Sequence, residues 1–204
     1  MQSSLLLDEA SPENQLPYDG EVFYFGQILT PDKSDDYYHR LMNSVAWQHD
    51  HAVIFGKQIT TKRKVAWYAD QLFSYTYSGT TKTALYWTAE LLELRHIAEK
   101  VTGAKFNSCL LNLYHNGDEG MAWHSDAEKE LVEGAVIASI SLGTERKFSF
   151  KHKTSKETVS VMLGPGSLLT MAGLTQTHWL HRLPPTKKVH SPRINLTFRL
   201  MRTD

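Results

Sequence analysis

The segment MAWHSDAE, residues 121–128, places a histidine and an aspartate two residues apart, directly after a glycine-rich turn. If the segment is a strand, His124 and Asp126 point to the same side, because side chains alternate along a strand. An imidazole and a carboxylate arranged in this way can share one metal ion. A second histidine would complete the two-histidine, one-carboxylate face of non-haem Fe(II) oxygenases, which leaves three coordination positions open.

Four later histidines are candidates for the third ligand. The segment THWLHRLPP, residues 177–185, supplies the best pair of candidates. Spacing alone does not choose between the two histidines of that segment. The four candidates are His152, His178, His181 and His190.

The segment PRINLTFRLM, residues 192–201, alternates between apolar and polar side chains and predicts a strand with two different faces. Its apolar face belongs to the core. If the polar face points into a barrel, its two arginines need an anionic partner, because an unpaired buried charge is costly. A dicarboxylate fits, since arginine binds a carboxylate as a bidentate fork; on a solvent-facing strand no partner is needed. The polar face consists of Arg193, Asn195, Thr197 and Arg199, and Asn112 and Tyr114 share a face of an earlier strand.

Two helices are predicted before the strands begin. Residues 30–45 form the first, with Thr30 as its N-cap, Pro31 in its first turn and aspartates near its positive end. Residues 88–101 form the second, and Gly103 stands where a C-terminal cap belongs. The apolar faces expected are Tyr37, Leu41 and Val45 on the first helix, and Leu91, Leu92 or Leu94, Ala98 and Val101 on the second.

From residue 106 onward the apolar period changes to two, and Gly, Pro and charged turns separate short segments. This pattern predicts an α+β, mainly β, fold with an antiparallel sandwich or jelly-roll core and supporting helices. We expect an acidic arm over residues 1–29 and one domain over 30–204. The strands are predicted at 106–114, 135–143, 146–153, 158–163, 166–172, 177–181 and 193–201.

The net charge of the 204-residue chain is zero, but the charge is unevenly distributed. Residues 1–36 carry a net charge of −7, so the remainder carries +7. Basic clusters at residues 57–64, 146–153 and 184–193 suit a polyanion such as nucleic acid, with a solvated lysine surface as the alternative. Cys109 is the only cysteine and sits in an apolar run. Together with the lack of a signal-peptide pattern, this predicts a buried thiol in an intracellular, reducing compartment.

The motifs above, taken together, resemble the AlkB-type dioxygenases, which remove methyl groups from nucleic-acid bases. The resemblance runs from about residue 53 to 201 and does not cover the acidic residues before about 20. It is strongest to the DNA-repair branch, and it implies a double-stranded β-helix, or jelly roll. The matching motifs, in order, are FGK, SYTYSG, NLYHNGDEGMAWHSDAE, IASISLG, GSLLTM, THWLHRLPP and PRINLTFR.

Carried over by position, the resemblance makes His124, Asp126 and His181 the iron ligands and leaves His178 as a neighbour. It implies Fe(II), 2-oxoglutarate and O₂ as cofactors, with ascorbate as a supporting reductant. We expect Arg193 to hold the distal carboxylate of 2-oxoglutarate, while Arg199 braces its metal-proximal end. The 2-oxoglutarate pocket implied in this way is Asn112, Tyr114, Arg193, Thr197 and Arg199.

A methylated base inside a duplex cannot reach such a centre, so it must be flipped out. The resemblance implies that Tyr77 and His124 flank the flipped base and that Glu128 meets its amino group. Phe55 resembles a wedge that fills the gap in the stack, and basic neighbours would hold phosphates. The alternatives are plain strand packing for the tyrosines and a buried Phe55. The nucleotide-recognition hairpins fall at about 50–80, and the expected substrate contacts are Phe55, Gly56, Lys57, Arg63, Tyr75, Tyr77 and Glu128.

The function implied is oxidative demethylation of 1-methyladenine and 3-methylcytosine in DNA, a direct reversal that releases formaldehyde. The partner expected is single- or double-stranded DNA bound by a monomer, with no membrane, in the cytoplasm of a bacterium or the nucleus of a eukaryote. An RNA demethylase and a protein hydroxylase of the same chemistry are alternatives, and basic segments with paired tyrosines disfavour the hydroxylase. A non-catalytic nucleic-acid-binding jelly roll is disfavoured by the intact histidines, aspartate and arginines.

Overall fold

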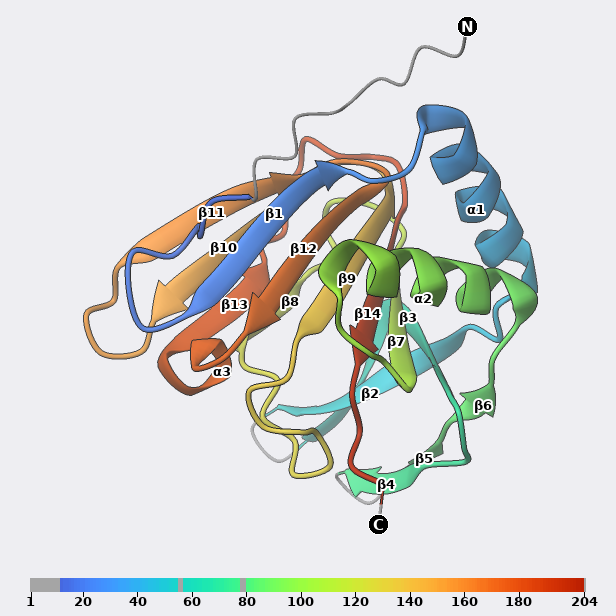
Figure 1. Cartoon of the computed structure of the whole chain (residues 1–204). Helices are drawn as coiled ribbons and strands as arrows, with labels where there is room; N and C mark the ends of the chain where they lie inside the picture. The colour runs from blue at the N-terminus through green and yellow to red at the C-terminus, as the bar shows by residue number, and fades with distance from the viewer. Residues whose placement is uncertain (1–11, 55–56, 78–79, 204) are drawn as a thin grey trace, which may run out of the picture.

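The computed structural model of the protein describes residues 12–54, 57–77 and 80–203, with side chains described outside 51–59 and 75–82. Helices α1 (Pro31–Ser44) and α2 (Ala89–Thr102) lie together on one face of a large sheet, and a smaller sheet lies on the other side (Figure 1). Strands dominate the described residues, and the main sheets are antiparallel. This arrangement confirms the predicted α+β, mainly β, jelly-roll class.

The large sheet has eight strands, and most spatial neighbours in it are distant in the sequence. Each pairing is antiparallel apart from one short parallel pair at residues 68–69 and 85–86. The order is β1 (Glu21–Gln27), β12 (Ser167–Ala172), β9 (Ile137–Gly143), β14 (Arg193–Arg199), β7 (Ser108–Tyr114), β3 (Lys57–Ala69) and β2 (Gln48–Ile54), with β6 (Leu85–Tyr86) paired to β3.

The facing sheet has four strands, in the order β11 (Thr158–Leu163), β10 (Arg146–His152), β13 (Trp179–Leu183) and β8 (Met121–His124). A short helix, α3 (Thr175–His178), leads directly into β13. The strand predicted over 177–181 therefore begins two residues later, because residues 175–178 form a helical turn. The expected hairpins over about 50–80 are the pair β2 and β3 and the pair β4 (Ser74–Tyr77) and β5 (Thr80–Thr83).

Both predicted helices are confirmed, together with the predicted caps Thr30 and Gly103. The Thr30 side chain accepts a hydrogen bond from the N–H of Lys33 at α1, and Thr88 caps α2 in the same way. Gly103 ends α2 with a left-handed backbone at φ 70°, a conformation that favours glycine. The expected apolar face of α2 was wrong at Val101, which is exposed on the last turn of the helix.

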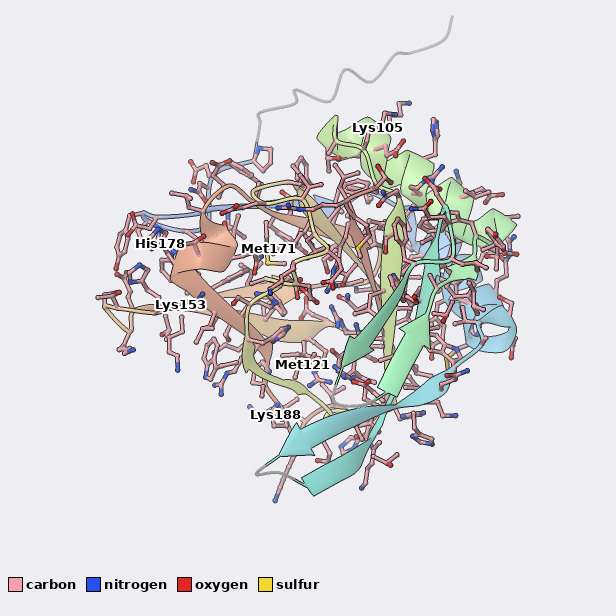
Figure 2. All side chains as sticks on the ribbon, turned by 90° about the horizontal axis from the view of Figure 1, so that it is seen from below. Lys105, Met121, Lys153, Met171, His178 and Lys188 are labelled. Carbon is pink, nitrogen blue, oxygen red and sulfur yellow. The ribbon has the colours of Figure 1, made fainter. Side chains whose placement is uncertain are left out.

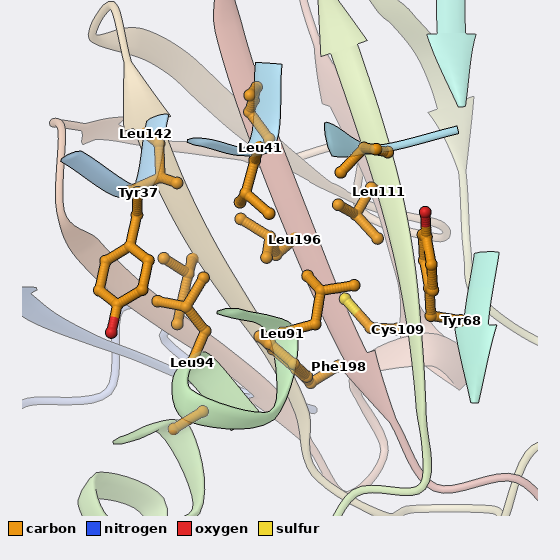
Figure 3. Close-up of a cluster of buried hydrophobic side chains, with 14 of the residues drawn as sticks. Tyr37, Leu41, Tyr68, Leu91, Leu94, Cys109, Leu111, Leu142, Leu196 and Phe198 are labelled. Carbon is orange, nitrogen blue, oxygen red and sulfur yellow. The ribbon is translucent and has the colours of Figure 1, made fainter. Parts of the chain in front are cut away.

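The main core lies between these helices and the large sheet. Figure 3 shows side chains of both helices packed against those of β7, β9 and β14. Cys109 is fully buried among them, as predicted, and burial raises the pKa of its thiol well above the ordinary value. None of the described helices is long and apolar enough to cross a membrane.

The two faces of β14 separate the core from the site. Ile194, Leu196 and Phe198 are fully buried in the main core. The alternate residues therefore point to the opposite side, toward the small sheet. The polar face continues onto the two neighbouring strands. Arg193 pairs with Tyr114 of β7, and Asn195 pairs with Ser141 of β9. The predicted strand with one apolar and one polar face is confirmed, and its polar face is not the outer surface.

The acidic segment expected as a separate arm over residues 1–29 requires a correction. Strand β1 pairs with β12 along its length, and Val22 is fully buried in a second apolar cluster. Residues 21–27 are therefore an edge strand of the large sheet. The sequence pattern missed this strand because it has no regular alternation of apolar and polar side chains.

Candidate active site

His124, Asp126 and His181 come together between the two sheets. Their ligand atoms all lie within 4.8 Å of one another. Oδ1 of Asp126 is 3.8 Å from Nε2 of His124 and 4.0 Å from Nε2 of His181. Two imidazole nitrogens and one carboxylate oxygen on the same side form the donor set that non-haem iron requires.

The hydrogen bonds of His124 leave the correct nitrogen free for a metal. Its Nδ1 lies 2.8 Å from the carbonyl oxygen of Ala122. A carbonyl can only accept, so Nδ1 carries the proton, and Nε2 presents its lone pair toward Asp126. A main-chain carbonyl that fixes the tautomer in this way is a common support of metal-binding histidines.

Strand pairing selects His181 from the four histidine candidates. His181 lies directly opposite His124 in the pairing of β13 with β8, and their ring centroids are 4.2 Å apart. Strand alternation was expected to bring Asp126 to the same side as His124. This explanation is wrong, because β8 ends at His124 and Asp126 follows in a loop. The strand therefore stops before Glu128, and strand alternation does not place Glu128 beside the two ligands.

A second group of possible ligands contains two of the other candidates, His152 and His178, together with Asp19. In His152, Nδ1 accepts a hydrogen bond from the main-chain N–H of Ser155 at 3.0 Å, so the neutral ring carries its proton on Nε2. That proton faces Asp19, whose carboxylate is 3.4 Å away. Because Nε2 then has no lone pair to offer, this group fits a polar contact between His152 and Asp19 better than a metal site. The fourth candidate, His190, is exposed and belongs to neither group.

Burial and charge keep the proposed ligands in their metal-binding forms. Burial works against a charged Asp126, but Arg199, His181 and His124 outweigh it, and the pKa of Asp126 is lowered. Burial also lowers the pKa of His181 to about 4, although Asp126 acts in the opposite direction. At neutral pH the carboxylate is therefore ionised and the His181 imidazole is neutral.

Acid is expected to destabilise the metal-free protein through His181. Its pKa is about 4 when folded and 6.5 in its ordinary state, so the unfolded chain binds more protons between these values. The free energy of unfolding therefore falls as the pH falls from 6.5 to 4, by about 3 kcal/mol. Urea denaturation across this range measures the effect. His181→Gln should show a flatter profile and His190→Gln the wild-type profile; an unchanged slope in His181→Gln would contradict the assignment.

The polar face of β14 forms a buried polar cluster beside the metal ligands. The Arg193 guanidinium is buried and donates hydrogen bonds to Ser141 Oγ and Asn195 Oδ1, both at 2.8 Å. Among the described residues, neither its Nε nor the buried Oδ1 of Asn112 has a hydrogen-bond partner. Within the described part of the chain no carboxylate pairs with Arg193. Burial lowers the pKa of Arg193 to about 10, and the group stays charged at neutral pH. These features fit an anionic ligand such as 2-oxoglutarate.

Arg199 connects this polar cluster to the metal ligands. Its Nη2 is 3.1 Å from Oδ1 of Asp126, and its Nη1 donates to Oε1 of Glu128 at 3.2 Å. Thr197, between the two arginines, accepts a hydrogen bond from the Asn195 amide at 2.7 Å. Arg199 therefore lies next to the metal ligands, and Arg193 lies at the other end of β14. This is the order that the two proposed arginine roles require.

Sequence comparison agrees with this chemistry. Residues 21–199 match the 2OG-Fe(II) oxygenase superfamily. The chain belongs to this family. Its cofactors are Fe(II), 2-oxoglutarate and O₂, and the His124, Asp126 and His181 cluster fits the iron.

The chain is similar to three curated relatives in sequence and to one solved structure in fold. DNA oxidative demethylase ALKBH2 of Bos taurus is 44% identical over 154 residues, 72% of this chain and 55% of the relative. ALKBH2 of Arabidopsis thaliana is 32% identical over 213 residues, 91% and 68% of the two chains. Alpha-ketoglutarate-dependent dioxygenase alkB homolog 3 of Homo sapiens is 41% identical over 123 residues, 56% and 43%. The structure of OsALKBH1 has a TM-score of 0.63 at 15% identity, covering 87% and 97%, and supports the fold alone.

This chain is shorter than the relatives that it matches. The matched region covers between 55% and 64% of the three mammalian ALKBH2 proteins. We therefore treat the activity and substrate of those proteins as a proposal for this chain.

On the substrate side, the structure tests only some of the expected contacts. Arg63 is buried, forms an ion pair with Asp50 and donates to Met121 Sδ, so it is not displayed as a phosphate contact. That expectation is wrong for this structure, because strand alternation turns Arg63 inward while Lys62 remains exposed. Phe55 and Gly56 lie outside the described residues, and for Lys57, Tyr75 and Tyr77 the structure describes the main chain alone.

Sequence reasoning missed three residues at this site. Ser141 supports Arg193 from β9, and the alternation in IASISLG was the signal that could have located it. Gln176 accepts a hydrogen bond from the main-chain N–H of Asp126 at 2.9 Å, and no local motif indicates it. Trp67 lines a small groove together with Glu128 and Arg199.

A cavity of about 430 Å³ adjoins the carboxylate end of the metal face. It is lined by Asp126, Glu128 and Arg199 on one side and by Lys153 and Gln176 on another. Neither histidine ligand lines it, so this cavity meets the proposed metal position at the aspartate.

Proposed function

We propose that this oxygenase removes N-methyl groups from 1-methyladenine and 3-methylcytosine in DNA, releasing formaldehyde and restoring the base. The observation that carries the proposal is a histidine–aspartate–histidine face beside a buried arginine, in a chain that is 44% identical over 154 residues to a DNA oxidative demethylase. Bound Fe(II) with 2-oxoglutarate would supply the oxidant that hydroxylates the methyl carbon. The residues of the chain hold, orient and shield the reactants.

In this proposal His124, Asp126 and His181 hold the iron. Arg193 binds the distal carboxylate of 2-oxoglutarate as a fork, and its fixed hydrogen bonds to Ser141 and Asn195 keep the guanidinium in place before the ligand arrives. The remaining pocket residues, Asn112, Tyr114, Thr197 and Arg199, line the same interior face. A preorganised pocket of this kind costs little rearrangement on binding.

The methylated base must leave the DNA stack to reach the iron. We propose that Tyr77 stacks on the flipped base and that Phe55 fills the gap it leaves, with Lys57 among the phosphate contacts. Tyr75 would support Tyr77 from the same strand. We further propose that the chain acts as a monomer in an intracellular, reducing compartment, cytoplasmic in a bacterium or nuclear in a eukaryote. The buried thiol of Cys109 is compatible with such a compartment.

The direct test measures succinate and formaldehyde release together. We expect both products with DNA oligonucleotides that contain 1-methyladenine or 3-methylcytosine, at a rate well above that with unmethylated DNA. Matched RNA oligonucleotides and methylated peptides separate the alternatives. Faster turnover on RNA would replace the DNA assignment, and the absence of methyl-dependent succinate release on every substrate would reject a demethylase.

Glu128 is expected to determine which lesions are repaired. Its side chain is 41% exposed and holds Arg199 at a single oxygen, so the carboxylate can turn to a base. Glu128→Ala should reduce repair of 1-methyladenine and 3-methylcytosine by ~10-fold or more relative to 3-methylthymine, because only the first two carry a positive charge and an amino group. Competition kinetics with the three lesions measure this ratio, and equal losses on all three would mean that Glu128 only supports Arg199.

A further inference from the structure

The loop that carries Asp126 is held from outside its own sheet. Because β8 ends at His124, the main-chain N–H of Asp126 has no strand partner in β13. The side-chain oxygen Oε1 of Gln176 accepts from it instead, at 2.9 Å. A single neutral amide therefore replaces the strand pairing at the residue whose carboxylate must meet the two histidines.

Gln176 can act as a fixed point because its own helix is anchored. Thr175 Oγ1 accepts a hydrogen bond from the N–H of Glu21 at 2.8 Å and donates to the carbonyl of Ala172 at 2.6 Å, which ties α3 to β1 and to the end of β12. The same segment continues into β13 and reaches His181 five residues after Gln176. One short unit thus positions both the aspartate loop and the second histidine.

Lys153 adds a second tie to this unit. Its Nζ donates to the carbonyl oxygen of Gln176 at 2.8 Å and lies 3.4 Å from Oγ of Ser125, the residue between the two proposed ligands. Figure 2 shows Lys153 and His178 on the same side of the molecule, close to the short helix. The main-chain N–H of Lys153 also donates to the carbonyl of His178 at 2.8 Å.

Fixing the main chain matters because one oxygen of Asp126 has to serve two partners. Arg199 Nη2 lies 3.1 Å from Oδ1, the same oxygen that faces the nitrogens of His124 and His181, so the guanidinium competes with a metal for that oxygen. Holding the Asp126 N–H limits how far the loop can follow Arg199.

We propose that Gln176 is a positioning residue for the metal site, and that its hydrogen bond to the Asp126 main chain sets the metal affinity. The proposal rests on His124, Asp126 and His181 being the ligands. Outer partners of metal ligands typically contribute 10- to 100-fold in affinity. Gln176 reaches the ligand through its main chain, so we expect an effect at the lower end of that range.

The experiment compares three variants of the full chain. Gln176→Met keeps the approximate shape and removes the amide oxygen, whereas Gln176→Glu keeps an oxygen that can accept the same hydrogen bond. Gln27→Met is the matched control, because Gln27 is exposed and bonds the carbonyl of Pro165 at the opposite end of β12. Anaerobic Mn(II) titration followed by electron paramagnetic resonance gives the affinity, and the melting temperature of the metal-free protein reports on folding.

Gln176→Met should bind Mn(II) about 10-fold more weakly, with a melting temperature close to that of the wild type. Gln176→Glu should recover most of the affinity, and Gln27→Met should bind normally. Wild-type affinity in Gln176→Met overturns the proposal. So does an affinity loss in Gln176→Glu as large as that in Gln176→Met, or a loss accompanied by a large fall in melting temperature.

Asp126→Ala, measured in the same titration, separates this proposal from the ligand assignment. If Asp126→Ala binds Mn(II) like the wild type, the ligand set itself is wrong. If Asp126→Ala loses the metal while Gln176→Met retains it, the ligand set stands and the role of Gln176 is rejected.

Discussion

Asp126→Ala is expected to bind Fe(II) at least ~100-fold more weakly and to lose succinate and formaldehyde release, because even outer partners of metal ligands contribute 10- to 100-fold. The carboxylate is the one anionic ligand in the set and lies within 4.0 Å of both imidazole nitrogens. Without it, the two imidazoles face the positive Arg199 guanidinium, which repels a cation. Anaerobic Fe(II) titration and product assays measure the two losses.

The variant should remain folded. The hydrogen bond to Gln176 uses the main chain of Asp126, which alanine preserves, and Arg199 keeps Glu128 as a partner. His178→Ala is the matched control, because His178 lies three residues before His181 but belongs to the group around Asp19. It should keep normal iron affinity. Turnover that survives in Asp126→Ala, or iron loss in His178→Ala, would assign the metal to other residues.

Arg193→Ala is expected to raise the 2-oxoglutarate concentration needed for half-maximal turnover at least ~10-fold. A charge-assisted hydrogen bond contributes about 1.5–3 kcal/mol, and each 1.4 kcal/mol corresponds to a factor of about ten in affinity. The guanidinium is buried, has no carboxylate partner in the described part of the chain and is held by Ser141 and Asn195. Titration of 2-oxoglutarate against the metal-loaded protein measures the change directly, and iron affinity should change far less.

Arg182→Ala provides the comparison. Its guanidinium lies over the Trp123 ring, 4.5 Å from the ring centroid, and not on the polar face of β14. Removing that charge should leave 2-oxoglutarate binding unchanged. If Arg193→Ala binds 2-oxoglutarate as the wild type does, the dicarboxylate pocket lies elsewhere; if both variants weaken equally, the effect is one of general charge.

The helices, most strands and the polar strand face could be predicted because the forces that set them are local. Thr30, Thr88 and Gly103 act on the helix ends beside them. Alternation along β14 separates core from pocket within seven residues. The same local logic failed for β1, whose irregular sequence becomes a strand because β12 offers it an open edge.

The sequence by itself determined which chemical groups are present, and their types already indicated an iron site and a carboxylate pocket. It did not choose between His178 and His181, because the choice depends on where α3 ends and on the pairing of β13 with β8, about 57 residues away in the chain.

Tertiary structure also decided which histidine nitrogens are free. The ring of His124 faces a carbonyl and the ring of His152 faces an N–H, so the two have opposite tautomers. Tertiary contacts also pair the buried Arg63 with Asp50 and place the Gln176 side chain where it accepts a hydrogen bond from the Asp126 main chain. Each of these outcomes depends on contacts between segments that only the folded sheets bring together, which is why periodicity and spacing could not contain them.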